Sequence, residues 1–290
     1  MEELAAGVEN VGVEYRRPLR THPGRASSRA VAPHFVEFLP AAPLRDIVAA
    51  FWVHTAPPAP TPHVVIPDGC FDLVLTLEES NEGNAFAFGP ITACSEVTLE
   101  TGTTYAGIRL QPWVGAAALG IDGSSLTNQI FALPQAGYQL QRLSSDISAS
   151  LTLLTDVAHG LADGFRWTAH QRAVREAYAR IACPEGAHSV RELGADLGVA
   201  DRTLRRAFEA VTGSGPKFAL RVARFQRALA GLGTTSSLAH LAYACGYADQ
   251  AHLCNELSQL AGTTPSVLQR RARLAEISKT QLNCLDRTEA

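Results

Sequence analysis

The pattern of apolar and polar positions in the last third of the chain predicts two short helices joined by a tight turn. Ser189 and Glu192 have the S-x-x-E spacing of a capping box, which starts a first helix running to about Leu197. Gly198 suits the left-handed conformation that ends a helix. A second helix is expected from about 201 to 211, because apolar residues recur there at i, i+3, i+4 and i+7: Leu204, Ala207, Phe208 and Val211.

The same pattern returns further along the chain. Up to the turn the two copies match at an offset of 48, as for Gly198 and Gly246, and beyond it at 49, as for Gly213 and Gly262, so the second turn has one extra residue. Self-similarity at a fixed period marks a repeated supersecondary unit. Two short helices with a polar outer face on the second are the helix-turn-helix design. A helical hairpin of another all-α protein is the alternative, and two copies in register favour DNA binding.

Five motifs follow one another across these copies. They are L-x-R-x-F at Leu204, Arg206 and Phe208, GSGPK at 213–217, R-F-x-x-A in the predicted joining helix 221–232, GYADQAHL at 246–253, and G-x-x-P at Gly262 and Pro265. In these motifs the segment from about Ser189 to Arg271 resembles the double helix-turn-helix domain of AraC/XylS-type transcription regulators. The resemblance implies two units joined by one long helix. Each unit would place its second helix in the major groove of one double-stranded DNA site, with RNA polymerase as a partner.

The outer faces of the two second helices carry the candidate DNA contacts. They are Arg202, Thr203, Arg205 and Arg206 in the first unit, and Gln250, Ala251, His252 and Asn255 in the second. Arginine bridges O6 and N7 of guanine, glutamine or asparagine reads adenine, and alanine meets the thymine methyl group. For His252 two interpretations stay open, a phosphate contact or a surface histidine without a partner.

The second unit is expected to contribute less affinity than the first. Asn255 stands where the family usually has a basic residue, and Asp249 and Glu256 add negative charge nearby. The first unit should therefore carry most of the affinity and the second should tune position or specificity. At least one arginine of the joining helix is expected to be structural and to pair with an acid across the two units: Arg221, Arg224 or Arg227.

The charge of the chain is divided along its length. Residues 35–165 hold three basic against thirteen acidic residues, a net of −10, whereas residues 166–290 hold seventeen against eleven, a net of +6. The whole-chain charge of −3 conceals this asymmetry. Because the local field decides phosphate binding, an acidic middle and a basic end fit a sensor region attached to a DNA-binding region.

The middle of the chain shows strands followed by helices, the order of an α+β domain. Two apolar runs surround a Pro-Asp-Gly turn within 63–77, further strands follow, and two longer helices are expected at about 139–161 and 168–183. Ser124 or Ser125 is expected to cap a short turn. The marks PDGC-x-DL at 67–73 and G-[IV]-R at 107–109 resemble the amino-terminal region of a subset of AraC-like regulators.

A cysteine between two carboxylates is the strongest candidate for other chemistry. Asp68, Cys70 and Asp72 lie close in sequence, with His54 and His63 nearby. The carboxylates would raise the pKa of the thiol, which disfavours a nucleophilic thiolate. The carboxylates and histidines also lack the spacing of metal ligands. We therefore predict no catalytic residue, no metal and no cofactor, and interpret Cys70 as a small buried side chain.

The expected architecture is a mixed β/α sensor domain followed by an all-α double helix-turn-helix domain. Its expected boundaries are a disordered arm at 1–33, the sensor at 34–165, the DNA-binding domain at 166–276 and a tail at 277–290. The six cysteines lack a C-x-x-C pair, the start lacks the regions of a signal peptide, and no apolar run is long enough for a membrane span. These features predict a cytoplasmic protein.

The resulting hypothesis is a ligand-responsive transcription regulator. Helices between about Leu140 and Ala182 would dimerise the sensor or relay its signal, so a small-molecule effector and a second copy of the chain are candidate partners. Two alternatives stay open: an enzyme fused to an AraC-like domain, and a regulator controlled by abundance or by a protein partner.

Overall fold

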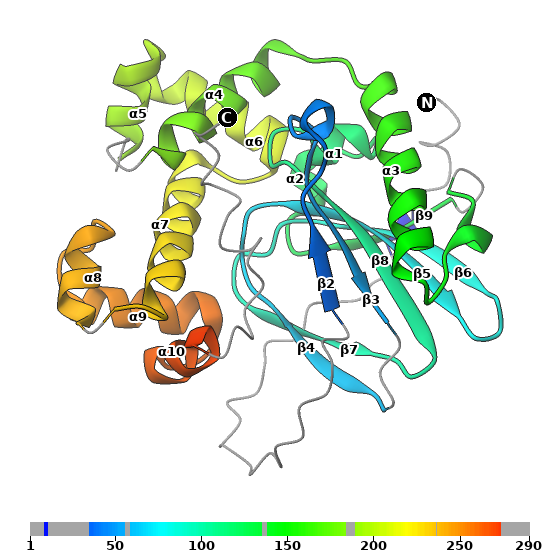
Figure 1. The fold of residues 1–290 in the computed structure, drawn as a ribbon. Coiled ribbons are helices and arrows are strands. Elements are labelled where there is room, and N and C mark those ends of the chain that lie inside the picture. The colour runs from blue at the N-terminus through cyan, green and yellow to red at the C-terminus, as the bar shows by residue number, and fades with distance from the viewer. Residues whose placement is uncertain are drawn as a thin grey trace.

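The protein consists of a β-rich part followed by an all-helical part, as the sequence predicts (Figure 1). The computed structural model describes residues 9–10, 35–55, 59–134, 138–183, 189–235 and 237–273. We call the sheets together with the helices from α1 (Gly115–Ala118) to α3 (Ile147–Gly164) the β-domain, and the helices from α4 (Ala169–Ala182) to α10 (Pro265–Arg273) the helical domain. Of the expected arm at 1–33 only Glu9–Asn10 belongs to the described residues, and the expected tail lies outside them.

The β-domain contains an antiparallel seven-stranded sheet in the order β1-β9-β6-β5-β8-β3-β2 and a two-stranded sheet of β4 and β7. The strands are β1 Glu9–Asn10, β2 Phe35–Phe38, β3 Val48–His54, β4 Thr61–Val65, β5 Phe71–Glu78, β6 Gly83–Phe88, β7 Ser95–Leu99, β8 Thr103–Leu110 and β9 Ile130–Leu133. The helices are α1 Gly115–Ala118, α2 Gly123–Leu126 and α3 Ile147–Gly164, with 3-10 turns at Ala42–Leu44 and Leu140–Arg142.

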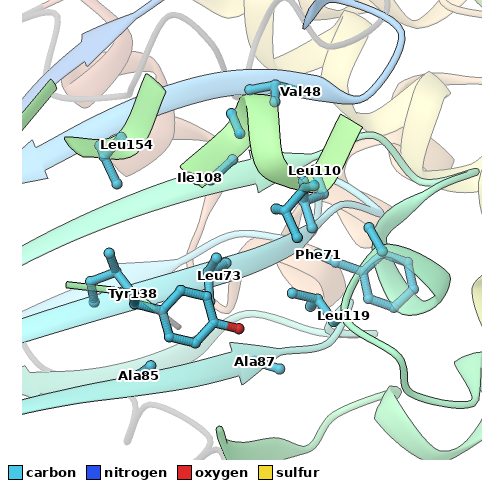
Figure 2. Close-up of a cluster of buried hydrophobic side chains, with 14 of the residues drawn as sticks. Val48, Phe71, Leu73, Ala85, Ala87, Ile108, Leu110, Leu119, Tyr138 and Leu154 are labelled. Carbon is cyan, nitrogen blue, oxygen red and sulfur yellow. The ribbon is translucent and has the colours of Figure 1, made fainter. Parts of the chain in front are cut away.

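Strand alternation gives the large sheet two different faces. Successive side chains of a strand point to opposite sides, so Phe71 and Leu73 of β5 lie on one face and Asp72 on the other. The first face is apolar and packs against α3, whose Leu153 and Leu154 belong to the same core. Figure 2 shows this core between the strands and helix, from Val48 and Ile108 to Tyr138 and Leu154. The opposite face is polar around the middle strands.

The helical domain stands beside the sheet, with its two halves connected by one long helix (Figure 1). Its helices are α4 Ala169–Ala182, α5 Val190–Leu197, α6 Asp201–Thr212, α7 Pro216–Leu232, α8 Leu238–Ala244, α9 Gln250–Ala261 and α10 Pro265–Arg273. Helix α7 enters two apolar cores. Ala219 and Ala223 pack with α4, α5 and α6, whereas Phe225 and Leu229 pack with α8, α9 and α10.

Several expected boundaries in the β-domain were wrong or missing. Strands β2, β3 and β9 were not expected; β3 is almost continuously buried and lacks the alternation that identifies a strand. The first long helix begins at Ile147 instead of about 139, because the Asp146 carboxylate accepts the Ser148 N–H and fixes the start there. Likewise Asp122, and neither of the two expected serines, caps the turn at α2.

Among the described helices, none combines the length and apolarity that a bilayer crossing requires.

Candidate DNA-binding surface

The first helix-turn-helix unit, α5 and α6, forms as the sequence predicts. Ser189 accepts the backbone N–H of Glu192 at 3.2 Å and begins α5. Gly198 ends α5 with φ +63°, and Gly213 ends α6 with φ +67°, both in the left-handed region that favours glycine. The four residues expected on the inner face of α6 are all buried, and Phe208 is fully so: Leu204, Ala207, Phe208 and Val211.

The outer face of α6 presents its predicted contacts to solvent. The exposed side chains are Arg202, Thr203, Arg205 and Arg206. Within the described part of the chain, no salt bridge or side-chain hydrogen bond engages these three arginines. Their guanidinium groups are therefore available to an external acceptor such as a base edge or a phosphate.

The second unit, α8 and α9, has the extra turn residue that the offset predicts. Gly246 adopts φ +75° like Gly198, but α9 begins at Gln250, one residue later than α6 begins after its glycine. Asp249 occupies the N-cap position of α9, and its carboxylate accepts the backbone N–H of His252 at 2.7 Å. Its negative charge is thus directed at the start of α9, where a helix dipole favours it.

The outer face of α9 is exposed at its four predicted positions: Gln250, Ala251, His252 and Asn255. The interpretation of His252 as a histidine without a partner was wrong. Its Nδ1 accepts the Ala248 N–H at 3.4 Å, and its ring meets Tyr247 edge-on at 5.2 Å between centroids. This ring therefore also closes the turn before α9.

Glu256 lies inside the helical domain, so the expectation that it weakens the outer face was wrong. Its side chain is 8% exposed, and its carboxylate accepts hydrogen bonds from Arg221 and Arg224 at 3.1 Å each. Arg224 also stacks over Tyr247, 4.7 Å from the ring centroid. The prediction that at least one arginine of α7 is structural and pairs with an acid is confirmed for Arg221 and Arg224, and both pairs join α7 to the second unit.

A second charged cluster lies on the polar face of the large sheet. Arg109 of β8 is 3.1 Å from Glu37, 3.2 Å from Asp68 and 3.5 Å from Asp72. The Trp52 indole donates to Asp72 at 2.8 Å and lies flat against Gly107, where a Cβ atom would come within 2.1 Å of the ring. The PDGC-x-DL motif supplies the two aspartates of this buried network, and the G-[IV]-R motif supplies its arginine.

The cysteine of the PDGC-x-DL motif lies buried beside this cluster, as the sequence predicts. Cys70 is 2% exposed, and the Asp68 carboxylate accepts its backbone N–H at 2.9 Å. Burial raises the pKa of Asp68, against the lowering effect of Arg109. Among the described residues, no group of three or more His, Cys, Asp or Glu side chains is arranged to hold a metal ion.

Two family models match the chain. One, described as a domain of unknown function (DUF6597), matches residues 36–132, and the other, described as a helix-turn-helix domain, matches residues 193–271. The first spans most of the β-domain strands and the second spans both helix-turn-helix units. No curated protein matches the chain.

Solved structures of regulators are similar to parts of the chain. An AraC-type transcriptional regulator from Chromobacterium violaceum is 27% identical over 34% of this chain and 88% of that chain, with a TM-score of 0.30. The DNA-binding domain of AdpA, solved with a target DNA, is 24% identical over 38% and 100%, with a TM-score of 0.32. ToxT from Vibrio cholerae is 8% identical over 82% and 97%, with a TM-score of 0.42.

The two units and the matched model define the class: a β-rich domain followed by a DNA-binding domain with two helix-turn-helix units. Residues 193–271 form a helix-turn-helix domain of the AraC/XylS type, which follows the β-domain in the chain.

The buried ion pairs of Glu256 predict a specific loss of stability. Glu256→Gln keeps the volume but leaves two guanidinium groups without their carboxylate. Removing one partner of a buried pair costs about 3–5 kcal/mol, and we expect the lower end because the arginines are partly solvated. Urea unfolding followed by circular dichroism measures this. The exposed Glu209→Gln on α6 is the control, and equal stabilities of the two variants would contradict the assignment.

His63 predicts an acid-sensitive β-domain. Burial lowers the pKa of His63 from 6.5 to about 4, helped by His54 and Arg109. The folded protein thus binds a proton at His63 less readily than the unfolded chain does. The free energy of unfolding therefore has its full value above pH 6.5 and falls as the pH drops towards 4. Thermal unfolding measured between pH 6.5 and pH 4 tests this. His63→Gln should reduce the loss of stability on acidification, and the exposed His159→Gln should not. The same acid sensitivity in wild type and His63→Gln would refute this.

Proposed function

We propose that this protein regulates transcription by binding one asymmetric double-stranded DNA site with both helix-turn-helix units. The observation that carries the proposal is the pair of exposed outer faces, on α6 and α9, supported by two independent apolar cores around α7. Such a helix enters the major groove with the residues of its first turns facing the base edges. The candidate contacts of both helices lie in these first turns.

The two units contribute differently in this proposal. The outer face of α6 presents three arginines, which suit guanine and phosphate, whereas that of α9 presents Gln250, His252 and Asn255. Phosphate contacts from arginine dominate affinity, and uncharged amides discriminate adenine without adding charge. We propose that the first unit supplies most of the affinity and the second selects position and sequence.

We further propose that the β-domain receives the signal, as a small molecule or a partner subunit, and that RNA polymerase is the partner that reads the bound state. The acidic charge of the β-domain and the buried network around Arg109 distinguish it from a second DNA-binding module. Regulation would be a population shift, in which the bound signal favours one domain arrangement.

Selecting binding sites from random duplex DNA with the full-length chain tests the proposal. We expect a long asymmetric motif with two parts. One short motif would limit base reading to a single unit, and no enrichment would contradict the proposed function.

Arg206→Ala should weaken binding to the selected site and relax the preference at one base pair. A bidentate arginine–guanine contact contributes about 1–3 kcal/mol of discrimination. Titrations against the site and its single-base variants measure both effects. Arg172→Ala, on the exposed side of α4, removes the same charge elsewhere and should leave base preference unchanged. If Arg206→Ala keeps the wild-type preference at every position, Arg206 does not read a base.

Asn255→Arg should tighten binding through phosphate. One added phosphate contact increases the slope of log affinity against log salt by about 1. Thr152→Arg, on the exposed face of α3, adds the same charge far along the chain from either recognition helix and controls for net charge. Equal salt slopes for Asn255→Arg and Thr152→Arg would place Asn255 away from the DNA backbone.

A further inference from the structure

The β-domain contacts α4 through the Asp46–Arg175 ion pair and the Trp113–Tyr178 ring contact. It also contacts three different parts of the DNA-binding apparatus. One lies at the end of α6, one at the middle of α7 and one at the end of α9. The candidate DNA contacts occupy the opposite, amino-terminal ends of α6 and α9. Base reading and domain contact therefore use different ends of the same helices and are compatible.

The contact at the first unit is a close approach of two backbones. The Thr127 hydroxyl donates to the Gly213 carbonyl at 3.3 Å. A Cβ atom on Gly213 would lie 2.1 Å from the Gly123 carbonyl oxygen, and one on Gly123 would lie 2.8 Å from that of Val211. Only glycine at both positions allows α2 to sit this close to the end of α6.

The contact at α7 is a buried hydrogen bond. Gln226 is 1% exposed, and its Nε2 donates to the Pro67 carbonyl at 2.6 Å. Pro67 belongs to the turn between β4 and β5, which Asp68 holds in place through its ion pair with Arg109. The buried network of the sheet thus ends directly at the helix that joins the two units.

The contact at the second unit combines a backbone hydrogen bond with apolar packing. The Cys94 N–H donates to the Leu260 carbonyl at 2.9 Å, near the end of α9. Ile66, from the same turn as Pro67, packs in the core that contains Leu253 and Leu257. The second unit is thereby also attached to the β-domain.

We propose that the β-domain fixes the relative position of the two helix-turn-helix units, so that these contacts, in addition to α7, set the spacing between the two parts of the DNA site. Gln226 and Gly123 are positioning residues for this spacing. The inference rests on the proposed function, because it requires both units to bind one site. A signal that displaces the turn at Ile66–Cys70 would then change the preferred spacing of the two half-sites without altering a base contact.

The test compares wild-type and variant full-length proteins on the selected site and on duplexes with one base pair inserted or removed between its two parts. Such a change rotates and shifts one half-site, and we expect wild-type affinity to fall roughly tenfold or more. Gln226→Leu removes the donor to Pro67, and Gly123→Ala adds a methyl group against α6. We call this loss of affinity on the altered duplexes the spacing penalty. Each variant should reduce it by about threefold or more, because the two units can then change their relative position.

Each variant has a matched control. Gln269→Leu removes a glutamine-to-carbonyl hydrogen bond, to Thr235 at 3.3 Å, that lies within the helical domain. Gly160→Ala adds a methyl group to a helical glycine of α3, where a Cβ atom would meet nothing within 4 Å. Both controls should keep the wild-type penalty. Because the two variants act at separate contacts, a failure of one to fold leaves the other to decide.

The outcomes separate the inference from the proposed function. A two-part motif together with relaxed spacing in the variants alone supports both. A two-part motif with the wild-type spacing penalty in the variants, or with equal relaxation in the controls, overturns the inference and leaves the proposed function standing. If the wild-type chain selects no two-part motif, simultaneous binding fails and the inference fails with it.

Discussion

The arrangement of the DNA-binding apparatus depends on one constraint: helix α7 belongs to two hydrophobic cores at once. Its first half, through Ala219 and Ala223, completes the core around Phe208, and its second half, through Phe225 and Leu229, completes the core of the other unit. Because a helix transmits rotation along its length, neither unit can reorient independently without disturbing α7. The Glu256 carboxylate on Arg221 and Arg224 strengthens this link, since it joins α9 to α7 where the two cores meet.

The buried charges of the β-domain impose a second constraint, because they stabilise one another only as a group. A lone Arg109 in the sheet would be costly, and three carboxylates around it bring their own desolvation, so the group is stable only as a connected network. Trp52 and Gly107 complete it by ordering Asp72. The network therefore fixes the turn at Pro67 and Asp68, the segment that meets α7. A rigid charged network is what allows this turn to hold a helix of another domain in place.

Sequence periodicity predicted the helical domain well and the β-domain only in part. In the first unit, apolar spacing, the Ser189 cap of α5 and the glycines that end both helices act locally, so Leu204, Phe208 and Gly213 could be placed from the sequence alone. The exposure of all eight candidate DNA contacts followed from the same periodicity. The strand β3 and the inward direction of Glu256 could not be predicted, because both depend on neighbours far away in the chain. A buried strand loses its alternation, and a carboxylate on a helix reveals its direction only through the arginines that meet it.

The two units, although built on one pattern, differ at a position that has consequences for function. Ala207 of the first unit matches Glu256 of the second, at the offset of 49 that holds beyond the turn. Both residues are buried, but alanine only fills the core, whereas Glu256 binds α7 through two arginines. The second recognition helix is thus held to α7 by directional charge-assisted bonds in addition to apolar packing, whereas the first has apolar packing alone at the matching position. The exposed arginines of α6 are thus placed to bind DNA, whereas Arg221 and Arg224 of α7 hold the second recognition helix in position.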